Sequence, residues 1–92
     1  MTVDSIPPVI HNIPDDITVT IPLGLSGIQV SWEEPTATDN SGVVESSLRS
    51  MPPGSFFTVG RTPVTYTFTD PLDNSASATF YVDVRTGNYA TE

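Results

Sequence analysis

Acidic and amide side chains are concentrated in two segments that are also rich in turn-forming residues. They are Glu33, Glu34, Asp39 and Asn40 in the first segment and Asp70, Asp73 and Asn74 in the second. Calcium takes about six to eight oxygen ligands at about 2.3–2.6 Å, and carboxylate and amide oxygens supply them. If the two segments meet in space, Asp39, Asp70 and Asp73 are candidate ligands of a calcium ion, with Asp4 as a further carboxylate.

The same residues have a second interpretation that needs no metal. The sequences DNSG at 39–42 and DPLDN at 70–74 are typical of turns. Asp and Asn side chains accept hydrogen bonds from nearby backbone amides and tolerate left-handed backbone angles. Both interpretations stay open on the sequence alone, which favours turn formation over calcium binding.

The sequence contains few of the groups that nucleophilic or acid–base catalysis requires. His11 is the only histidine, and the chain has no cysteine and no lysine. A serine or threonine nucleophile would need that one imidazole beside it, together with an acid to orient the ring. The carboxylate pairs at 15–16 and 33–34 are sequence neighbours, whose side chains point to opposite faces of a strand. We therefore expect no enzymatic activity.

Two aromatic residues are candidates for stacking on a sugar, as in a carbohydrate-binding module. Trp32 shares its strand phase with Val30, which favours a position in the core. Tyr81 shares its phase with Asp83 and is expected to face outward. A single exposed tyrosine is common on protein surfaces and does not by itself indicate a binding site.

Charge and composition exclude several classes of protein. The 92 residues carry 11 acids against 3 arginines, for a formal net charge of -8. So few positive residues cannot neutralise a run of phosphates or hold an anionic membrane surface, which excludes a nucleic-acid-binding protein. Apolar runs are far shorter than the roughly 20 residues that span a bilayer, so we expect no membrane insertion. Without cysteine, a thiolate zinc site and a disulfide are impossible.

Period-two alternation of apolar and polar residues predicts β-strands along most of the chain. The clear runs are residues 17–21, 28–32, 64–70 and 78–85, and the weaker runs are residues 6–10, 43–49 and 56–59. Glycine, proline and Asp-Asn clusters separate these runs. Seven short strands in about 90 residues predict an all-β, immunoglobulin-like sandwich of two sheets without a disulfide.

This fold places the two acidic loops relative to one another. In an immunoglobulin-like sandwich, the loop after the 28–32 strand and the loop between the last two strands lie at the same end. The expected organisation is a lead-in or linker at residues 1–3, one domain at residues 4–85, and a tail or linker at residues 86–92.

Several motifs occur in an order that resembles a known extracellular module. The sequence is IPPVIHN at 6–12, IPDDI at 13–17, VSWEEPTATDNSG at 30–42, MPPGSFFTVGRTPVTYTFTD at 51–70 and DNSASATFYVDV at 73–84. This succession resembles the hyalin repeat, or HYR domain, over most of the chain. The resemblance implies an immunoglobulin-like extracellular module, usually in tandem arrays, with adhesion and matrix roles. Hyalin itself is a calcium-dependent matrix protein, so the resemblance adds some support to the calcium interpretation without making it the favoured one.

Two positions depart from the pattern of the HYR family. Many members have a cysteine just before the proline of their C-P segment and another in the last strand, and here those positions hold Ile13 and Ala78. The resemblance implies that these two residues lie close together. Because both are apolar, packing would replace a bond that contributes roughly 4 kcal/mol in the chain-entropy model.

The resulting hypothesis is a non-enzymatic adhesion or matrix repeat, at the cell surface or secreted, within a larger protein. Its partners would be neighbouring repeats of the same chain and other extracellular proteins, and calcium at Asp39, Asp70 and Asp73 would stiffen the joint between repeats. The alternative is an accessory module that binds a ligand or carbohydrate and is attached to a secreted enzyme. A sandwich fold hosts many functions and does not separate these two.

Overall fold

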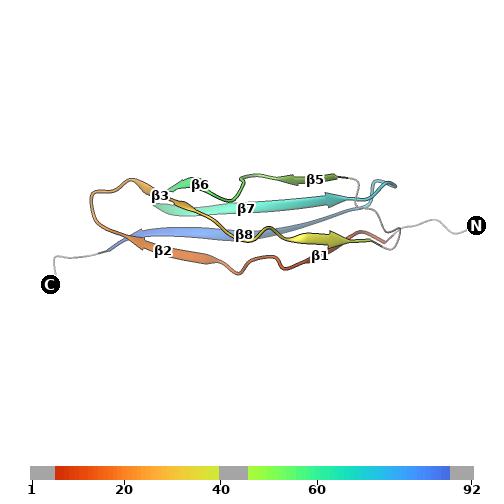
Figure 1. The fold of residues 1–92 in the computed structure, drawn as a ribbon, viewed down its shortest axis with the longest axis horizontal. Coiled ribbons are helices and arrows are strands. Elements are labelled where there is room, and N and C mark those ends of the chain that lie inside the picture. Colours follow the sequence, from red (N-terminus) through yellow and green to blue (C-terminus); the bar gives the residue numbers. More distant parts are fainter. Residues whose placement is uncertain (1–5, 40–45, 88–92) are drawn as a thin grey trace, which may run out of the picture.

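The chain forms eight β-strands in a computed structural model that describes residues 6–39 and 46–87 (Figure 1). The strands are β1 (Val9–His11), β2 (Ile17–Ile21), β3 (Gly27–Val30), β4 (Thr36–Thr38), β5 (Ser46–Arg49), β6 (Ser55–Thr58), β7 (Gly60–Thr69) and β8 (Ser75–Thr86). No helix long and apolar enough to cross a membrane occurs within these ranges. The all-β class predicted from the sequence is confirmed.

The antiparallel hairpin of β7 and β8 runs through the length of the molecule. Its register extends from Gly60 opposite Val84 to Thr69 opposite Ser75. From Val64 onward the side chains of β7 alternate between buried and partly exposed, as the period of two requires. This hairpin is the part of the fold that the sequence pattern predicts best.

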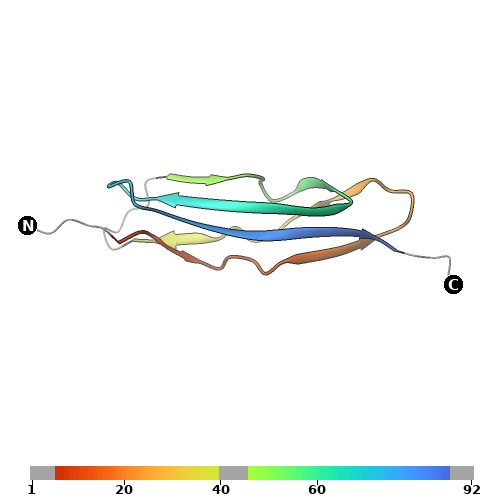
Figure 2. The ribbon, with the colours of Figure 1, turned by 180° about the vertical axis from the view of Figure 1, so that it is seen from behind.

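Two layers pack against each other (Figures 1 and 2). One layer is a four-stranded sheet in the order β2-β8-β7-β5, in which β2 runs parallel to β8. The other layer contains two antiparallel pairs, β1–β4 and β3–β6. Between β3 and β4 the ladder is interrupted at residues 31–35, where Pro35 has no backbone N–H to donate. The immunoglobulin-like sandwich is confirmed, with its second layer divided into two pairs.

The core lies between the layers and is built from inward-facing strand residues. Its buried members are Ile21, Val30, Phe57, Val64, Tyr66, Phe68, Phe80, Val82 and Val84. Trp32 packs on this cluster, with its ring edge-on to Phe57 and Phe80 at centroid distances of 5.9 and 5.2 Å. The inward position predicted for Trp32 is confirmed.

Some strands differ from their predicted bounds. The strand expected at residues 6–10 covers only Val9–His11, because Pro7 and Pro8 supply no N–H to a ladder. β4 is an additional strand of three residues, too short to show alternation. The strand expected at residues 43–49 is β5 from Ser46 onward, and its first part lies outside the described residues. The described chain thus has eight strands instead of about seven.

The register of β2 on β8 bears on the two positions where the family often has cysteines. Ile17 lies opposite Val82 in this parallel pair. Extending the register back by four residues brings Ile13 to the level of Ala78. Ile13 packs against the core, and Ala78 lies opposite the core residue Tyr66. Residues 12–16 lie outside β2, so the ladder itself does not pair Ile13 with Ala78, and their proximity stays a prediction.

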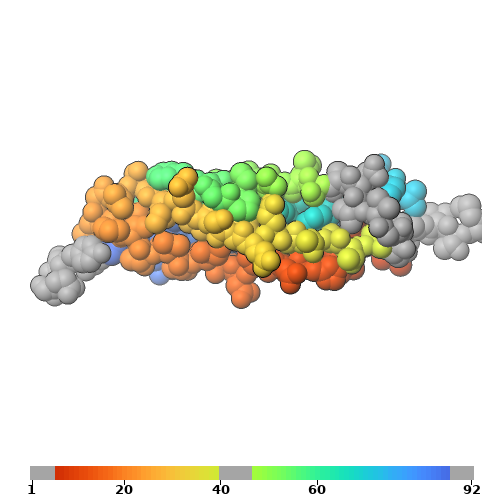
Figure 3. Space-filling model, viewed as in Figure 1, coloured from red at the N-terminus to blue at the C-terminus, as the bar shows by residue number. Residues whose placement is uncertain are grey.

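The described chain starts at one end of the sandwich and leaves at the other (Figure 2). We call the end that carries residues 6–8 and the 70–74 turn the leading end. The trailing end carries the 22–26 loop, the tight turn at Val59 and the last described residue, Gly87. In the space-filling view, the 22–26 loop forms the left-hand end of the described surface (Figure 3).

Candidate functional site

The turn between β7 and β8 is organised by the carboxylate of Asp70, which is 1% exposed. Its Oδ1 accepts hydrogen bonds from the backbone N–H of Leu72 at 2.9 Å and of Asn74 at 2.8 Å. Its Oδ2 accepts a third from the Asn74 side-chain amide at 3.0 Å. Asp73 adopts a left-handed φ of 67°. These features are those of the predicted turn.

β4 ends at Thr38, at the end of the sandwich that also carries the 70–74 turn (Figure 1), and Asp39 is the next residue. The prediction that the two loops share one end is thus met by the last described residue of the first loop. Among the described residues, however, no group of three or more His, Asp or Glu side chains is placed to hold a metal ion. Asp4 and Asn40 lie outside the described residues.

The fit of calcium to this end follows from these contacts. A calcium ion needs several oxygens that point at one position. Both oxygens of Asp70 already accept N–H groups of their own turn, which uses part of their capacity to bind a cation. The described residues do not fit a calcium ion in this arrangement. The contacts favour the turn interpretation over the calcium site expected at Asp39, Asp70 and Asp73, and a calcium titration tests between the two.

The acidic loop after β3 is divided between two places, contrary to the expectation that all its acids gather at one end. Glu34 lies part-way along the sandwich and pairs with Arg49 of β5, with 2.9 Å between Arg49 Nη1 and Glu34 Oε2. Among the described acids of this loop, only Asp39, directly after β4, reaches the leading end. The cause is β4, which carries the chain from Glu34 to Asp39 along the length of the molecule.

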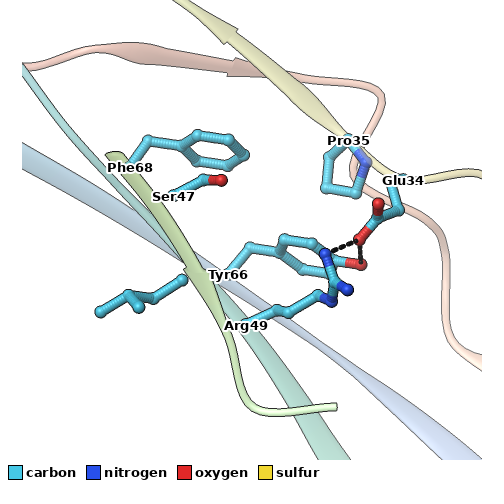
Figure 4. Close-up of a pocket in the computed structure, with 7 residues that line it drawn as sticks. Glu34, Pro35, Ser47, Arg49, Tyr66 and Phe68 are labelled. Atoms are coloured by element: carbon cyan, nitrogen blue, oxygen red, sulfur yellow. Dashed lines mark hydrogen bonds and ion pairs between the residues drawn. The ribbon is translucent and has the colours of Figure 1, made fainter. Parts of the chain in front are cut away.

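A polar network joins both layers at the place where Glu34 lies. Trp32 Nε1 donates to the hydroxyl of Tyr66 at 2.8 Å, and this hydroxyl donates to Glu34 Oε2 at 3.0 Å. Arg49 contacts the same Glu34 oxygen (Figure 4). Burial is the main reason that the pKa of Tyr66 is raised, and the Glu34 carboxylate raises it further against the lowering effect of the Trp32 hydrogen bond.

A small recess opens beside this network, between β5, β7 and the segment before β4 (Figure 4). Its volume is about 60 Å³, and its lining residues are Glu34, Pro35, Ser47, Leu48, Arg49, Tyr66 and Phe68. Ligand pockets usually measure about 300–1,000 Å³. The recess is therefore too small for a sugar ring or a cofactor. The hydrogen bonds of the network beside it connect the two layers.

Sequence reasoning did not find this network. Tyr66 shares the core phase of β7, so its hydroxyl required a buried or half-buried partner. That requirement was the available signal, but it does not identify Glu34, which lies 32 residues away. The indole N–H of Trp32 poses the same requirement, and the two residues satisfy each other.

Tyr81 faces outward from β8, as predicted, and it lies under the guanidinium of Arg61. The Arg61 Cζ atom is 4.3 Å from the centroid of the Tyr81 ring. Arg61 also pairs with Asp16 at 3.5 Å. One face of the ring is thus covered, which leaves Tyr81 poorly placed to stack on a sugar.

His11 bonds across the small β1–β4 ladder. Its Nε2 lies 2.7 Å from Thr38 Oγ1, and both side chains are exposed. A His–Thr contact is one element of a nucleophilic site, but here it joins two short strands at the surface. Its evident role is to tie β1 to β4.

Comparison with protein families identifies the chain. A family model described as the HYR domain matches residues 3–84. The chain belongs to the HYR domain family. Hyalin of Lytechinus variegatus is 49% identical over 82 residues, which are 89% of this chain and 16% of that protein. The family predicted from the motifs is confirmed.

Other relatives are similar to this chain over a still smaller part of their own length. Hyalin of Strongylocentrotus purpuratus is also 49% identical over 82 residues, which are 7% of that protein. The rat Sushi, von Willebrand factor type A, EGF and pentraxin domain-containing protein 1 is 39% identical over 74 residues, covering 77% of this chain and 2% of that protein. The chain thus spans less than a fifth of the hyalins that it matches. No solved structure matches it.

Proposed function

We propose that this HYR domain is a non-enzymatic repeat of a larger secreted or cell-surface protein. It would act there as a spacer or protein-interaction module in adhesion or in an extracellular matrix. Its relatives support this, because they are hyalins and a Sushi domain protein of which the matched segment is a small fraction. Calcium at the leading end would be an addition to this function and is not required for it.

The observation that carries the proposal is the position of the two ends of the described chain. The chain starts at the leading end and leaves at Gly87 on the trailing end, with the β7–β8 hairpin running between them (Figure 2). Such a domain can be joined to others head to tail without folding the array back on itself. The expected partners are the neighbouring domains of the same chain and other extracellular proteins.

Surface charge is consistent with a spacer. The chain has a formal net charge of -8, and like charges on successive repeats repel one another. This repulsion favours an extended array and opposes lateral association. A partner in adhesion would therefore need to bring basic groups or bind the exposed apolar side chains.

The alternative of a carbohydrate-binding module has less support. The two aromatic candidates are Trp32, packed on the core, and Tyr81, covered on one face by Arg61. A glycan array probed with the labelled chain tests this alternative. We expect no sugar to bind selectively, and a selective hit that Tyr81→Ala removes would replace the spacer proposal.

Small-angle X-ray scattering of one, two and three tandem copies of the 92-residue chain tests the spacer function. β8 alone has 12 residues. At about 3.3 Å a residue, it spans about 40 Å, so each copy is expected to add at least about that length to the maximum dimension. A maximum dimension that barely grows from one copy to three would show that the copies fold back, which contradicts the proposal.

A further inference from the structure

The second strand of the described chain, β2, and its last strand, β8, lie side by side. β2 pairs with β8 in parallel, from Ile17 opposite Val82 to Ile21 opposite Thr86. The chain reaches β2 from the leading end and leaves β8 at the trailing end (Figures 1 and 2). A force that separates the two ends of the domain therefore pulls β2 and β8 past each other along their length.

Further hydrogen bonds extend this ladder at both of its ends. Before the first paired residue, Asp16 Oδ1 accepts a hydrogen bond from the backbone N–H of Tyr81 at 2.9 Å. After the last, the N–H of Gly87 donates to the carbonyl of Ile21 at 2.7 Å. The connection between β2 and β8 thus continues beyond the regular strand on both sides.

The inner face of the β2–β8 ladder is closed to water by the core. Ile21, Val82 and Val84 are at most 1% exposed, and Ile17 and Val19 pack against the same cluster. Hydrogen bonds that water cannot replace on one side are harder to break, because an opened donor or acceptor is not solvated at once. Sliding β2 along β8 also requires its apolar side chains to leave the core.

We propose that the β2–β8 ladder is a mechanical clamp, which lets this domain resist force applied along its long axis. The direction of pulling decides the resistance. Force along the axis loads all the rungs together, whereas force across one end of the ladder breaks them one after another. This inference rests on the proposed function, since a spacer in an array is pulled through its two ends.

The short β1–β4 ladder lies in series with the clamp. It has three residue pairs, from Val9 opposite Thr38 to His11 opposite Thr36. With fewer rungs, it opens first and frees the chain as far as Asp16. The main resistance then comes from β2 and β8, whose pairing covers five residues of β2.

Pulling single molecules in two directions tests the clamp. The chain has no cysteine, so introduced cysteines give unique attachment points. Ile6→Cys with Gly87→Cys pulls along the axis, and Leu23→Cys with Gly87→Cys opens the ladder from its trailing end. Ile6 and Leu23 are matched, because both are exposed large apolar residues. We expect a severalfold higher unfolding force along the axis.

A second pair of variants tests the bond from Asp16 to the Tyr81 amide. Asp16→Ala removes the acceptor at the start of the ladder and is expected to lower the axial unfolding force. Asp15→Ala is the matched control, since it removes an exposed neighbouring acid, and it should leave that force unchanged. When the ladder is opened from Leu23, Asp16→Ala should have no effect, because that rung breaks last. A loss of force in both directions would indicate general destabilisation and contradict the clamp.

The clamp and the spacer function fail in different experiments. Equal unfolding forces in the two pulling directions would overturn the clamp, as would equal effects of Asp15→Ala and Asp16→Ala. If the tandem copies still scatter as an extended array, the spacer proposal survives that result. Compact tandem copies would instead overturn the spacer proposal without bearing on the difference between pulling directions.

Discussion

Replacing Asp70 by asparagine tests whether its carboxylate builds the β7–β8 turn. Asp70→Asn keeps the shape of the side chain and replaces one acceptor oxygen with an NH₂ group. The Oδ2 bond to the Asn74 side-chain amide, 3.0 Å long, is lost, and two donors then face each other. The bonds from the Leu72 and Asn74 backbone N–H groups lose their charge. Hydrogen bonds to charged groups contribute about 1.5–3 kcal/mol each.

These losses predict that Asp70→Asn lowers the free energy of unfolding by about 3 kcal/mol, one such bond plus the weakening of two others. Urea unfolding followed by Trp32 fluorescence measures it. With a slope of about 2 kcal/mol per molar urea, the midpoint falls by about 1.5 M. Trp32 suits this assay because it packs on the core and its surroundings change on unfolding.

Asp73→Asn is the matched control for Asp70→Asn. It makes the same chemical change in the same turn, at an exposed position whose φ of 67° asparagine tolerates. Both variants remove one negative charge, so effects of net charge cancel in the comparison. We expect Asp73→Asn to change the free energy of unfolding by no more than about 0.5 kcal/mol. If the two variants unfold at the same urea concentration, the Asp70 carboxylate does not build the turn.

Three further predictions concern the ties between layers, a close backbone approach and the metal. Tyr66→Phe should cost about 1–2 kcal/mol by leaving the Trp32 indole without its acceptor, whereas Tyr81→Phe should be neutral by urea unfolding. The raised pKa of Tyr66 means that its contribution to stability is present below the ordinary pKa and is lost as pH rises through the folded value, so Tyr66→Phe should lose less stability at alkaline pH. Gly27→Ala should cost about 1–3 kcal/mol, because an added Cβ would overlap the carbonyl oxygen of Phe57; a wild-type melting temperature would refute this. The melting temperature of the chain should be the same with added calcium as with a chelator. A higher melting temperature with calcium would support the metal site at the leading end.

The hairpin of β7 and β8 could be predicted from the sequence because local rules agree there. Val64, Tyr66 and Phe68 alternate with threonines, and turn residues separate this run from the next. Both strands then proved longer than their patterns. β7 begins at Gly60, before the alternation, because β8 is long enough to pair with that stretch.

β4 could not be predicted, because its pairing is not local. Thr36–Thr38 has one apolar residue and is a strand only because β1 lies beside it, about 27 residues away in the chain. Because the pairing of β4 is not local, the position of Glu34 could not be predicted either. Once β4 carries the chain along the molecule, Glu34 and Asp39 lie at different places, although only five positions separate them.

For Asp39 and the 70–74 turn, the sequence predicted a shared end of the sandwich but not how the carboxylate oxygens are used. Topology decides the end, and strand patterns indicate topology. The hydrogen bonds of Asp70 depend on the backbone angles of the turn that it forms, which the letters DPLDN allow but do not determine. The same residues are compatible with a carboxylate that accepts hydrogen bonds from its own turn and with one that binds a cation.

The spacer function and the clamp both depend on the leading and trailing ends of the domain lying far apart. Pulsed electron paramagnetic resonance between spin labels at Leu23→Cys and Leu72→Cys measures that separation, because both positions are exposed and lie at opposite ends. The 12 residues of β8 at about 3.3 Å each predict a distance of about 40 Å or more. A single narrow distribution at that distance supports the account, and a distance of about half that value would contradict it.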